Sequence, residues 1–245
     1  MTDYETNLTL LNVSQVVSLL SRAYIKLIKS GTPLKAFPSV MLWGPPGIGK
    51  SQGVREIAEN IRAKTGKRAA ITDVRLLLFN PVDLRGIPTA NADKTLAVWL
   101  KPQIFQMDDS ADVINILFLD EITAAPQSVQ AAAYQITLDR VIGEHRLPEN
   151  CIIIAAGNRV TDKSVAYNMP RALANRLLHM SVKGDPDSWH DWAVKTGIHR
   201  FVTSFLKYNP TALLRPDIPD SSLAFPTPRS WEMVSNILTG VSENI

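Results

Sequence analysis

The sequence predicts an α/β protein in which a central parallel sheet is flanked by helices and followed by a small helical group. Two observations predict this class. Several apolar segments show little alternation between apolar and polar residues, which is typical of strands covered by helices on both faces. Helical patterns alternate with these segments up to residue 182, and from residue 183 onward the pattern is helical. We therefore expect an α/β domain over residues 1–182 and a helical domain over residues 183–245.

The first predicted elements are a helix, a strand and a second helix. Asn12 suits the N-cap of the first helix, and Gly31 ends it. Residues 38–44, PSVMLWG, form a short strand that runs into a glycine-rich turn. Residues 51–67 form the second helix, with Gly66 at its end.

Four further strands follow, and together with the first they form the predicted sheet. They lie in the segments AAITDVRLLLF (69–79), INILFLDEI (114–122), CIIIAAGN (151–158) and NRLLHMSV (175–182). Between the second and third of these segments we expect a hairpin that turns at Gly143, preceded by a helix whose apolar face holds Val129, Ala132, Ala133 and Ile136.

Turn-forming residues mark the remaining segments. Residues 80–94, NPVDLRGIPTANADK, are the most loop-like part of the chain. Near the carboxyl end, Asp185 begins a helix that Gly197 ends, and a last helix opens in TPRSWEMVSNIL, residues 227–238. Four of the five tryptophans are predicted to be packing anchors, and Trp99, beside the loop-like segment, is the candidate for exposure.

Composition favours a globular protein with a substantial core, because 45% of the 245 residues are hydrophobic and 20% are charged. The net charge of +3 arises from 26 basic and 23 acidic residues spread along the chain, which argues neither for nor against nucleic acid. Cys151, the single cysteine, is expected to be a buried strand thiol. With no apolar run of about 20 residues and no signal-like amino terminus, we expect a soluble cytoplasmic protein without membrane contact.

The segment GPPGIGKS has the pattern of a phosphate-binding loop, GxxxxGK followed by Ser or Thr. Its glycines let the backbone wrap around a phosphate, and the helix that follows adds its positive dipole end. Lys50 supplies a cation for the outer phosphates, and Ser51 supplies a hydroxyl for Mg²⁺. The predicted binding residues are Gly44, Pro45, Pro46, Gly47, Ile48, Gly49, Lys50, Ser51 and Gln52.

Two acidic residues end the strand of ILFLDEI. After a phosphate-binding loop, a strand-end Asp120 suits a magnesium-orienting role, and Glu121 suits a general base that polarises the attacking water. Such a pair favours hydrolysis over transfer to a small molecule. The alternative is a solvated pair that merely caps the strand.

One amide and three arginines complete the candidate site. Asn158 follows the next strand and can position the attacking water, although Asn at a strand end is also a common turn former. Arg171 and Arg176 lie in NMPRALANRLLHM and can offset transition-state charge, with surface ion pairing as the alternative. Arg229 begins the last helix, from which it can reach back to a nucleotide. The four histidines show no ligand spacing, so no zinc site is predicted.

In this order, the motifs resemble those of the AAA+ ATPase superfamily of P-loop NTPases, and in particular its MoxR branch. GPPGIGKS is similar to Walker A, ILFLDE to Walker B, AAGN to sensor 1, ANR to the arginine-finger region and TPRSW to sensor 2. The resemblance covers about residues 35–235. The branch rests on PVDLRGIP with its following loop, which resembles the family's insertion in helix 2, and on the hairpin segment DRVIGEHRLPEN.

The resemblance implies a sheet ordered 5-1-4-3-2, a helical lid, and a ring, commonly hexameric, with ATP and Mg²⁺ held between subunits. Within one subunit it gives roles to Lys50, Ser51, Asp120, Glu121 and Asn158. Arg176 reaches the neighbouring subunit's site, Arg171 is a second such contact, and Arg229 senses nucleotide from the lid. Two features depart from the pattern: a leucine follows Arg176 where many relatives have an aromatic residue, and the lid is short by family standards.

The resemblance also implies that the protein remodels or activates client proteins, with a partner that carries a von Willebrand A domain. We expect residues 83–99 to contact the client. Two alternatives stay open: a nucleic-acid-directed motor or McrB-like NTPase subunit, and a nucleotide-gated scaffold with negligible turnover. The first has only Arg85, Lys94 and Lys101 as nearby positive charge, and the second conflicts with the presence of both Asp120 and Glu121. Because no NKxD motif is present, ATP is the expected nucleotide rather than GTP.

Overall fold

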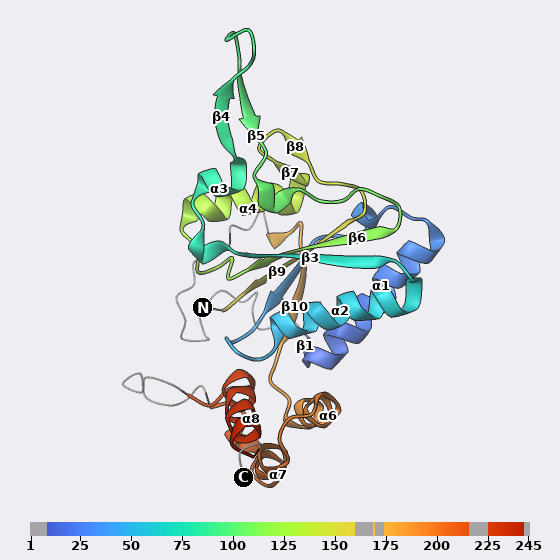
Figure 1. The fold of residues 1–245 in the computed structure, drawn as a ribbon, viewed down its shortest axis with the longest axis vertical. Helices are drawn as coiled ribbons and strands as arrows, with labels where there is room; N and C mark the ends of the chain where they lie inside the picture. Colours follow the sequence, from blue (N-terminus) through green and yellow to red (C-terminus); the bar gives the residue numbers. More distant parts are fainter. Residues whose placement is uncertain (1–8, 160–168, 170–173, 216–224, 243–245) are drawn as a thin grey trace.

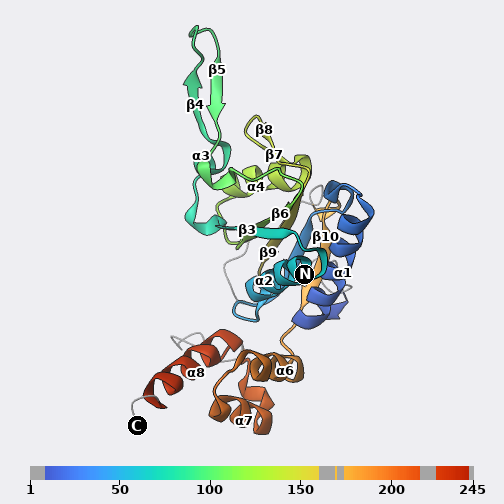
Figure 2. The ribbon, with the colours of Figure 1, turned by 45° about the vertical axis from the view of Figure 1, so that its right-hand side comes forward.

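The structure is a computed structural model that describes residues 9–159, 169, 174–215 and 225–242. A sheet with helices on both faces forms its body, a hairpin projects from one end, and a group of helices lies at the other (Figures 1 and 2). Short 3-10 helices cover Leu34–Ala36, Leu76–Leu78, Gln103–Phe105 and Pro210–Ala212.

The central sheet holds six parallel strands in the order β1-β10-β2-β9-β6-β3. When strands are counted from the one before the glycine turn, β10-β2-β9-β6-β3 is the predicted order 5-1-4-3-2. The two-residue strand β1 adds an edge that the sequence pattern did not predict. The bounds are β1 (Leu10–Leu11), β2 (Val40–Trp43), β3 (Arg68–Arg75), β6 (Val113–Asp120), β9 (Cys151–Gly157) and β10 (Leu178–Val182).

Two hydrophobic cores lie on opposite faces of this sheet. Helices α1 (Val13–Ser30) and α2 (Lys50–Thr65) cover one face, and α4 (Gln127–Asp139) covers the other. In β6, Ile116 and Phe118 pack toward α1 and α2. Leu117 and Leu119 pack toward α4, since successive strand residues point to opposite faces. Burial on both faces explains why the inner strands β2, β6 and β9 show no alternation in the sequence, whereas the edge strand β3 is partly exposed.

The caps predicted for the first helix are confirmed. The Asn12 side chain accepts a hydrogen bond from the Gln15 backbone N–H, and the Gln15 side chain accepts one from the Asn12 N–H. Gly31 adopts the left-handed conformation that ends the helix. Helix α1 therefore begins at a defined position, and its first turn helps to line the cleft described below.

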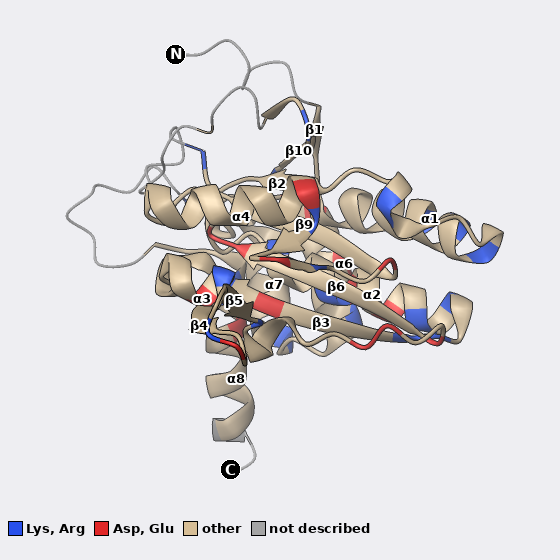
Figure 3. Ribbon diagram, turned by 90° about the horizontal axis from the view of Figure 1, so that it is seen from above, with Lys and Arg blue, Asp and Glu red and all other residues tan. Residues whose placement is uncertain are grey.

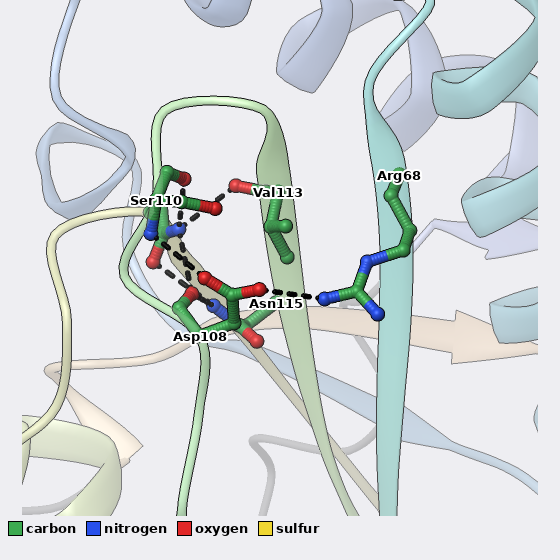
Figure 4. Close-up of polar contacts among 6 residues, drawn as sticks. Arg68, Asp108, Ser110, Val113 and Asn115 are labelled. Carbon is green, nitrogen blue, oxygen red and sulfur yellow. Dashed lines mark hydrogen bonds and ion pairs between the residues drawn. The ribbon is translucent and has the colours of Figure 1, made fainter.

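A polar network joins the amino ends of β3, β6 and β9, far from the glycine turn (Figure 4). Arg68 forms a 2.7 Å ion pair with Asp108, whose other carboxylate oxygen accepts the Ser110 N–H. Hydrogen bonds from Ser110 and the charge of Arg68 lower the pKa of Asp108. The Asn115 and Asn150 amides donate to the Asp108 carbonyl. This network fixes the loop that enters β6.

The prediction of a loop over residues 80–94 is wrong. The segment forms a short helix, α3 (Pro81–Arg85), and the first strand of an antiparallel hairpin, β4 (Ile87–Ala90) with β5 (Ala97–Leu100). Only the tip is a turn, in which the Asn91 side chain accepts from the Thr95 and Leu96 N–H groups. The Asn and Asp residues that suggested a loop serve as a helix cap and a turn closure instead.

A second hairpin supports the base of the projecting one. Strands β7 (Val141–Ile142) and β8 (His145–Arg146) turn at Gly143, as predicted. The His145 ring nitrogen Nε2 lies 2.8 Å from the Trp99 carbonyl oxygen, and Gly143 packs closely against the Arg85 backbone. Trp99, the candidate for exposure, is half-buried at this junction.

Helices α6 (Pro186–Thr196), α7 (Arg200–Tyr208) and α8 (Pro228–Ser242) pack around a third, small core at Val202, Leu206 and Leu213. Asp185 caps α6 and Gly197 ends it, which confirms both predicted boundaries. The Trp231 indole N–H donates to the Ala212 carbonyl and joins α8 to the segment after α7. That this group is a separate domain stays a prediction.

Gly86→Ala is expected to lower the free energy of unfolding by about 2–3 kcal/mol. Gly86 has φ +91°, and an added Cβ would lie 1.9 Å from the Leu100 carbonyl oxygen at the base of the hairpin. Thermal unfolding measures the effect, with Gly240→Ala on α8 as control, because a Cβ there meets nothing within 4 Å. An unchanged unfolding temperature for Gly86→Ala would show that the hairpin base relaxes freely.

Candidate functional site

The phosphate-binding loop joins the carboxyl end of β2 to the amino end of α2, as its sequence predicts. Gly47 (φ +78°) and Gly49 (φ +103°) adopt left-handed backbone conformations that side chains disfavour. Lys50 and Ser51 are the first two residues of α2, so the dipole of that helix points at the loop. The local sequence thus produces an anion-binding turn.

Lys50 connects the loop to the neighbouring strand. Its ammonium donates to the carbonyls of Gly44 and Pro45, and it lies 3.1 Å from the Asn158 Oδ1. Asn158 directly follows β9, which pairs with β2 in the sheet. Two residues 108 positions apart in the chain therefore meet where a nucleotide's outer phosphates would be held.

Ser51 and Asp120 provide a hydroxyl and a carboxylate at one point. The Ser51 Oγ donates to Asp120 Oδ2 at 3.1 Å, and Asp120 Oδ1 accepts the Glu121 N–H at 2.9 Å. Mg²⁺ prefers one or two protein oxygen ligands beside phosphate oxygens. The donor set at this point fits such an ion.

Glu121 has a strained backbone. Its φ of +58° lies in the left-handed region, which costs a residue other than glycine about 1–2 kcal/mol. The conformation turns the chain sharply at the end of β6, where the Ala124 N–H donates to the Glu121 carbonyl. Glu121 is half-buried and lines the cleft, a position that suits a general base.

Thr123 holds Asn158 in place, a role that sequence reasoning missed. The buried Thr123 hydroxyl accepts the Asn158 N–H at 3.0 Å and donates to the Asn158 carbonyl at 3.1 Å. A Cβ at Gly157 would lie 2.7 Å from the same hydroxyl, so a glycine is required beside it. The only sequence signal was a threonine two residues after the acidic pair.

Thr123→Val is expected to reduce turnover about tenfold, because it leaves the Asn158 N–H buried without an acceptor and loosens the amide. Steady-state hydrolysis of ATP measures the change. Thr123→Ser keeps the hydroxyl and should retain most of the rate. Equal rates for the valine variant and the native chain would exclude Thr123 as the support of Asn158.

A cleft of about 290 Å³ opens over the loop, between the sheet, the start of α1 and the helices α6 and α8. Of the predicted binding residues, Gly44 and Pro45 surround the Lys50 ammonium, while the others line the cleft. Its apolar side, suited to a flat base, holds Val13, Trp189, Trp192 and Leu213. The cleft is lined by Pro46, Gly47, Ile48, Gly49, Lys50, Ser51, Gln52, Asp120, Glu121, Asn158 and Arg229, among others.

Charged residues that the sequence analysis did not identify also surround the cleft. Arg75, the register partner of Asp120, lines it together with Arg55 and Lys183. Burial raises the pKa of Asp73 on β3, and the nearby Asp120 charge raises it further. Burial and the neighbouring Glu59 charge likewise raise the pKa of Glu56, which lines the cleft from α2.

The structure does not bring the candidate arginines together. Arg229 lines the cleft from α8. Arg176 is exposed in the turn before β10, at the amino end of that strand, whereas the cleft lies at the carboxyl ends of the parallel strands. Arg176 therefore lies at the end of the sheet opposite the cleft of its own chain. Arg171 lies outside the described residues.

Cys151 and the remaining described residues give three further findings. Cys151 is buried, which raises the pKa of its thiol to about 11. The described residues contain no cluster of three or more histidine, cysteine, aspartate or glutamate side chains arranged to hold a metal. Among them, no helix combines the length and the apolar character needed to cross a bilayer.

A family model described as "ATPase family associated with various cellular activities (AAA)" matches residues 39–179, more than half of the chain. The chain belongs to the AAA ATPase family. The matched range runs from the start of β2 into β10, so it includes Lys50, Asp120, Asn158 and Arg176. Helices α6 to α8 lie beyond it.

Individual relatives of this AAA chain are distant. The proteasome-associated ATPase of Renibacterium salmoninarum is 26% identical over 134 residues, which are 51% of this chain and 22% of that protein. Two variants of RuvB from Thermotoga maritima superpose with TM-scores of 0.53 and 0.51 at 16% identity, over 94% of this chain and 64% and 63% of theirs. The chain thus spans less than two thirds of the length of these relatives, and the RuvB likeness shows a shared fold.

Proposed function

We propose that this AAA protein binds ATP with Mg²⁺ in the cleft and hydrolyses it. The observation that carries the proposal is the meeting of Lys50 with Asn158 and of Ser51 with Asp120 at the carboxyl ends of adjacent strands. These four side chains supply a cation, an amide, a hydroxyl and a carboxylate to one cleft. Phosphoryl transfer needs such positioning and charge neutralisation more than covalent chemistry.

Each residue has a separate task in this mechanism. Lys50 would exchange its carbonyl partners for the outer phosphates. Ser51 and Asp120 would hold a magnesium ion, which would offset phosphate charge. Glu121 accepts a proton from the attacking water. Asn158, fixed by Thr123, orients that water without competing for its proton. Arg229 contacts the nucleotide from α8.

We further propose that the chains assemble as a ring, commonly a hexamer, in which Arg176 completes the neighbouring site, with Arg171 as a second contact. Two observations support this arrangement. Arg176 is exposed at the end of β10 opposite the cleft, and within the described part of the chain its guanidinium forms no hydrogen bond or ion pair. An arginine supplied by a neighbour accelerates phosphoryl transfer by about 10³ to 10⁵-fold.

The proposed output is remodelling or activation of a client protein, as in the MoxR branch, with a partner that carries a von Willebrand A domain. The hairpin β4–β5 supports a client role, because it projects from the body (Figure 2) and its Ile87, Leu96 and Leu100 side chains are exposed. Both signs of charge occur on α2 and α6, whereas α1 carries basic residues alone (Figure 3), so charge does not select between a protein client and nucleic acid. The exposed apolar side chains of the hairpin are what favours a protein client.

Mixing two inactive variants tests the proposal. Arg176→Ala subunits keep an intact base, and Glu121→Gln subunits keep an intact arginine, so mixed interfaces pair the two functional groups. ATP hydrolysis is expected to reappear when the two proteins are combined. Absence of recovery in rings shown to be mixed would contradict the assignment of Arg176 to a neighbouring site.

A further inference from the structure

One histidine, His179, contacts the turn that carries Arg176. The Ala174 carbonyl accepts the Leu177 N–H at 3.2 Å, which closes the turn, and it also lies 2.7 Å from the His179 Nε2. Leu177 is buried against the core beneath α4, whereas Arg176 is exposed. His179 therefore helps to fix this short turn at the start of β10, together with the Leu178 N–H, which donates to the Ser39 carbonyl.

The same imidazole contacts the strand that leads into the phosphate-binding loop. The Trp43 indole Nε1 lies 2.8 Å from His179 Nδ1, and the two rings stack at 5.9 Å between centroids. An indole N–H can only donate and a carbonyl can only accept. Hence Nδ1 accepts from Trp43, Nε2 donates to Ala174, and one neutral tautomer satisfies both bonds.

Trp43 directly precedes the loop. The next residue, Gly44, accepts a hydrogen bond from the Lys50 ammonium, which contacts phosphate in the proposed mechanism. A chain of contacts thus runs from Lys50 through Gly44, Trp43 and His179 to the turn of Arg176. This series of contacts extends along β10, because His179 lies near the amino end of that strand and Trp43 pairs near its carboxyl end.

A parallel contact strengthens the link between β10 and the cleft. Arg159, which follows Asn158, donates to the buried Ser181 hydroxyl on β10. His179 and Ser181 alternate with the apolar Met180 and Val182, which pack toward α1 and α2. Polar groups in a covered sheet cost desolvation energy that apolar residues would avoid. Their presence favours a role other than packing.

We propose that His179 is a positioning residue for Arg176, which couples the state of a subunit's own phosphate-binding loop to the arginine that it presents to its neighbour. The inference rests on the proposed function, because it requires Arg176 to act in the adjacent site. The coupling has a direction: nucleotide bound in one subunit changes the rate of hydrolysis in the next subunit through Trp43 and His179.

Two conservative variants interrupt this series of contacts at different points. His179→Asn places an oxygen near the Nδ1 position and lacks the donor toward Ala174. His179→Gln keeps an N–H toward Ala174 and lacks the acceptor for Trp43. Each is expected to reduce steady-state ATP turnover about fivefold, the factor that one neutral hydrogen bond contributes. ATP affinity, measured with Glu121→Gln in the background, is expected to stay within about twofold, because the cleft residues are untouched.

The deciding readout is recovery in mixed rings. A His179 variant has an intact cleft and a misplaced arginine, so added Glu121→Gln subunits should raise the activity per His179-variant subunit. Loss of turnover without this recovery, or unchanged turnover in both variants, would overturn the inference. If Arg176→Ala mixed with Glu121→Gln also fails to recover, the neighbouring-site role itself is wrong. If only the His179 mixtures fail, the proposed function stands and the coupling does not.

Discussion

Lys50→Ala is expected to abolish detectable ATP binding, with a loss of affinity of at least about a hundredfold. The Lys50 ammonium donates to the Gly44 and Pro45 carbonyls of the loop and to the Asn158 amide oxygen. Alanine leaves the outer phosphates without that charge, and a charge-assisted hydrogen bond in a shielded site is among the stronger polar contacts. Calorimetric titration with ATP and Mg²⁺ measures the change.

Lys35→Ala is the matched control. Lys35 forms an exposed ion pair with Glu149, and such pairs contribute little to stability. This variant should bind ATP like the native chain. Native-like affinity in Lys50→Ala, with the fold intact by circular dichroism, would remove the phosphate-binding role from the loop.

Glu121→Gln is expected to retain ATP binding and assembly while hydrolysis falls by about 10²- to 10⁴-fold. The amide preserves the size of the side chain and the half-buried position, and the left-handed backbone at φ +58° tolerates glutamine as it tolerates glutamate. What is lost is the group that accepts the proton of water. Asp120 remains to contact Ser51.

Single-turnover hydrolysis measures this step without interference from product release. Glu149→Gln makes the same substitution at an exposed glutamate, and it should leave the rate of hydrolysis unaltered. Native turnover in Glu121→Gln would assign the base to another residue. Negligible turnover in the native chain would instead favour a nucleotide-gated scaffold over an enzyme.

The parts of the fold that follow from local chemistry could be predicted from the sequence. Asn12, Gly31, Asp185 and Gly197 cap their helices as expected, because capping depends on a few neighbouring residues. Strand order followed from the family resemblance, since the hydrophobic pattern alone contains no information on which strands pair. The edge strand β1 consists of only two residues, too few to give a pattern.

The hairpin β4–β5 was mistaken for a loop because it is exposed. All four residues of β4 are exposed, so no buried face imposes alternation on its sequence. Its stability comes from contacts that are distant in sequence, such as His145 with the Trp99 carbonyl and Gly143 with Arg85. A reading along the chain cannot detect such pairs.

The residues of the candidate site likewise divide into those with a sequence motif and those without one. The loop, the acidic pair and Asn158 follow from motifs, and the fold brings them together. Thr123, Arg75 and the pair of Trp43 with His179 depend on three-dimensional neighbours and have no motif of their own. Residues that support the lining of the cleft therefore require the structure, whereas Lys50, Asp120 and Asn158 could be predicted from their motifs.

The proposed ring is tested most directly by measuring the mass of Glu121→Gln in solution, by light scattering with and without ATP and Mg²⁺. We expect a nucleotide-dependent shift to a hexamer-sized species, because in the proposed ring the exposed Arg176 completes the cleft of another copy. A protein that binds ATP yet stays monomeric at every concentration tested would contradict the ring and the role of Arg176 in it.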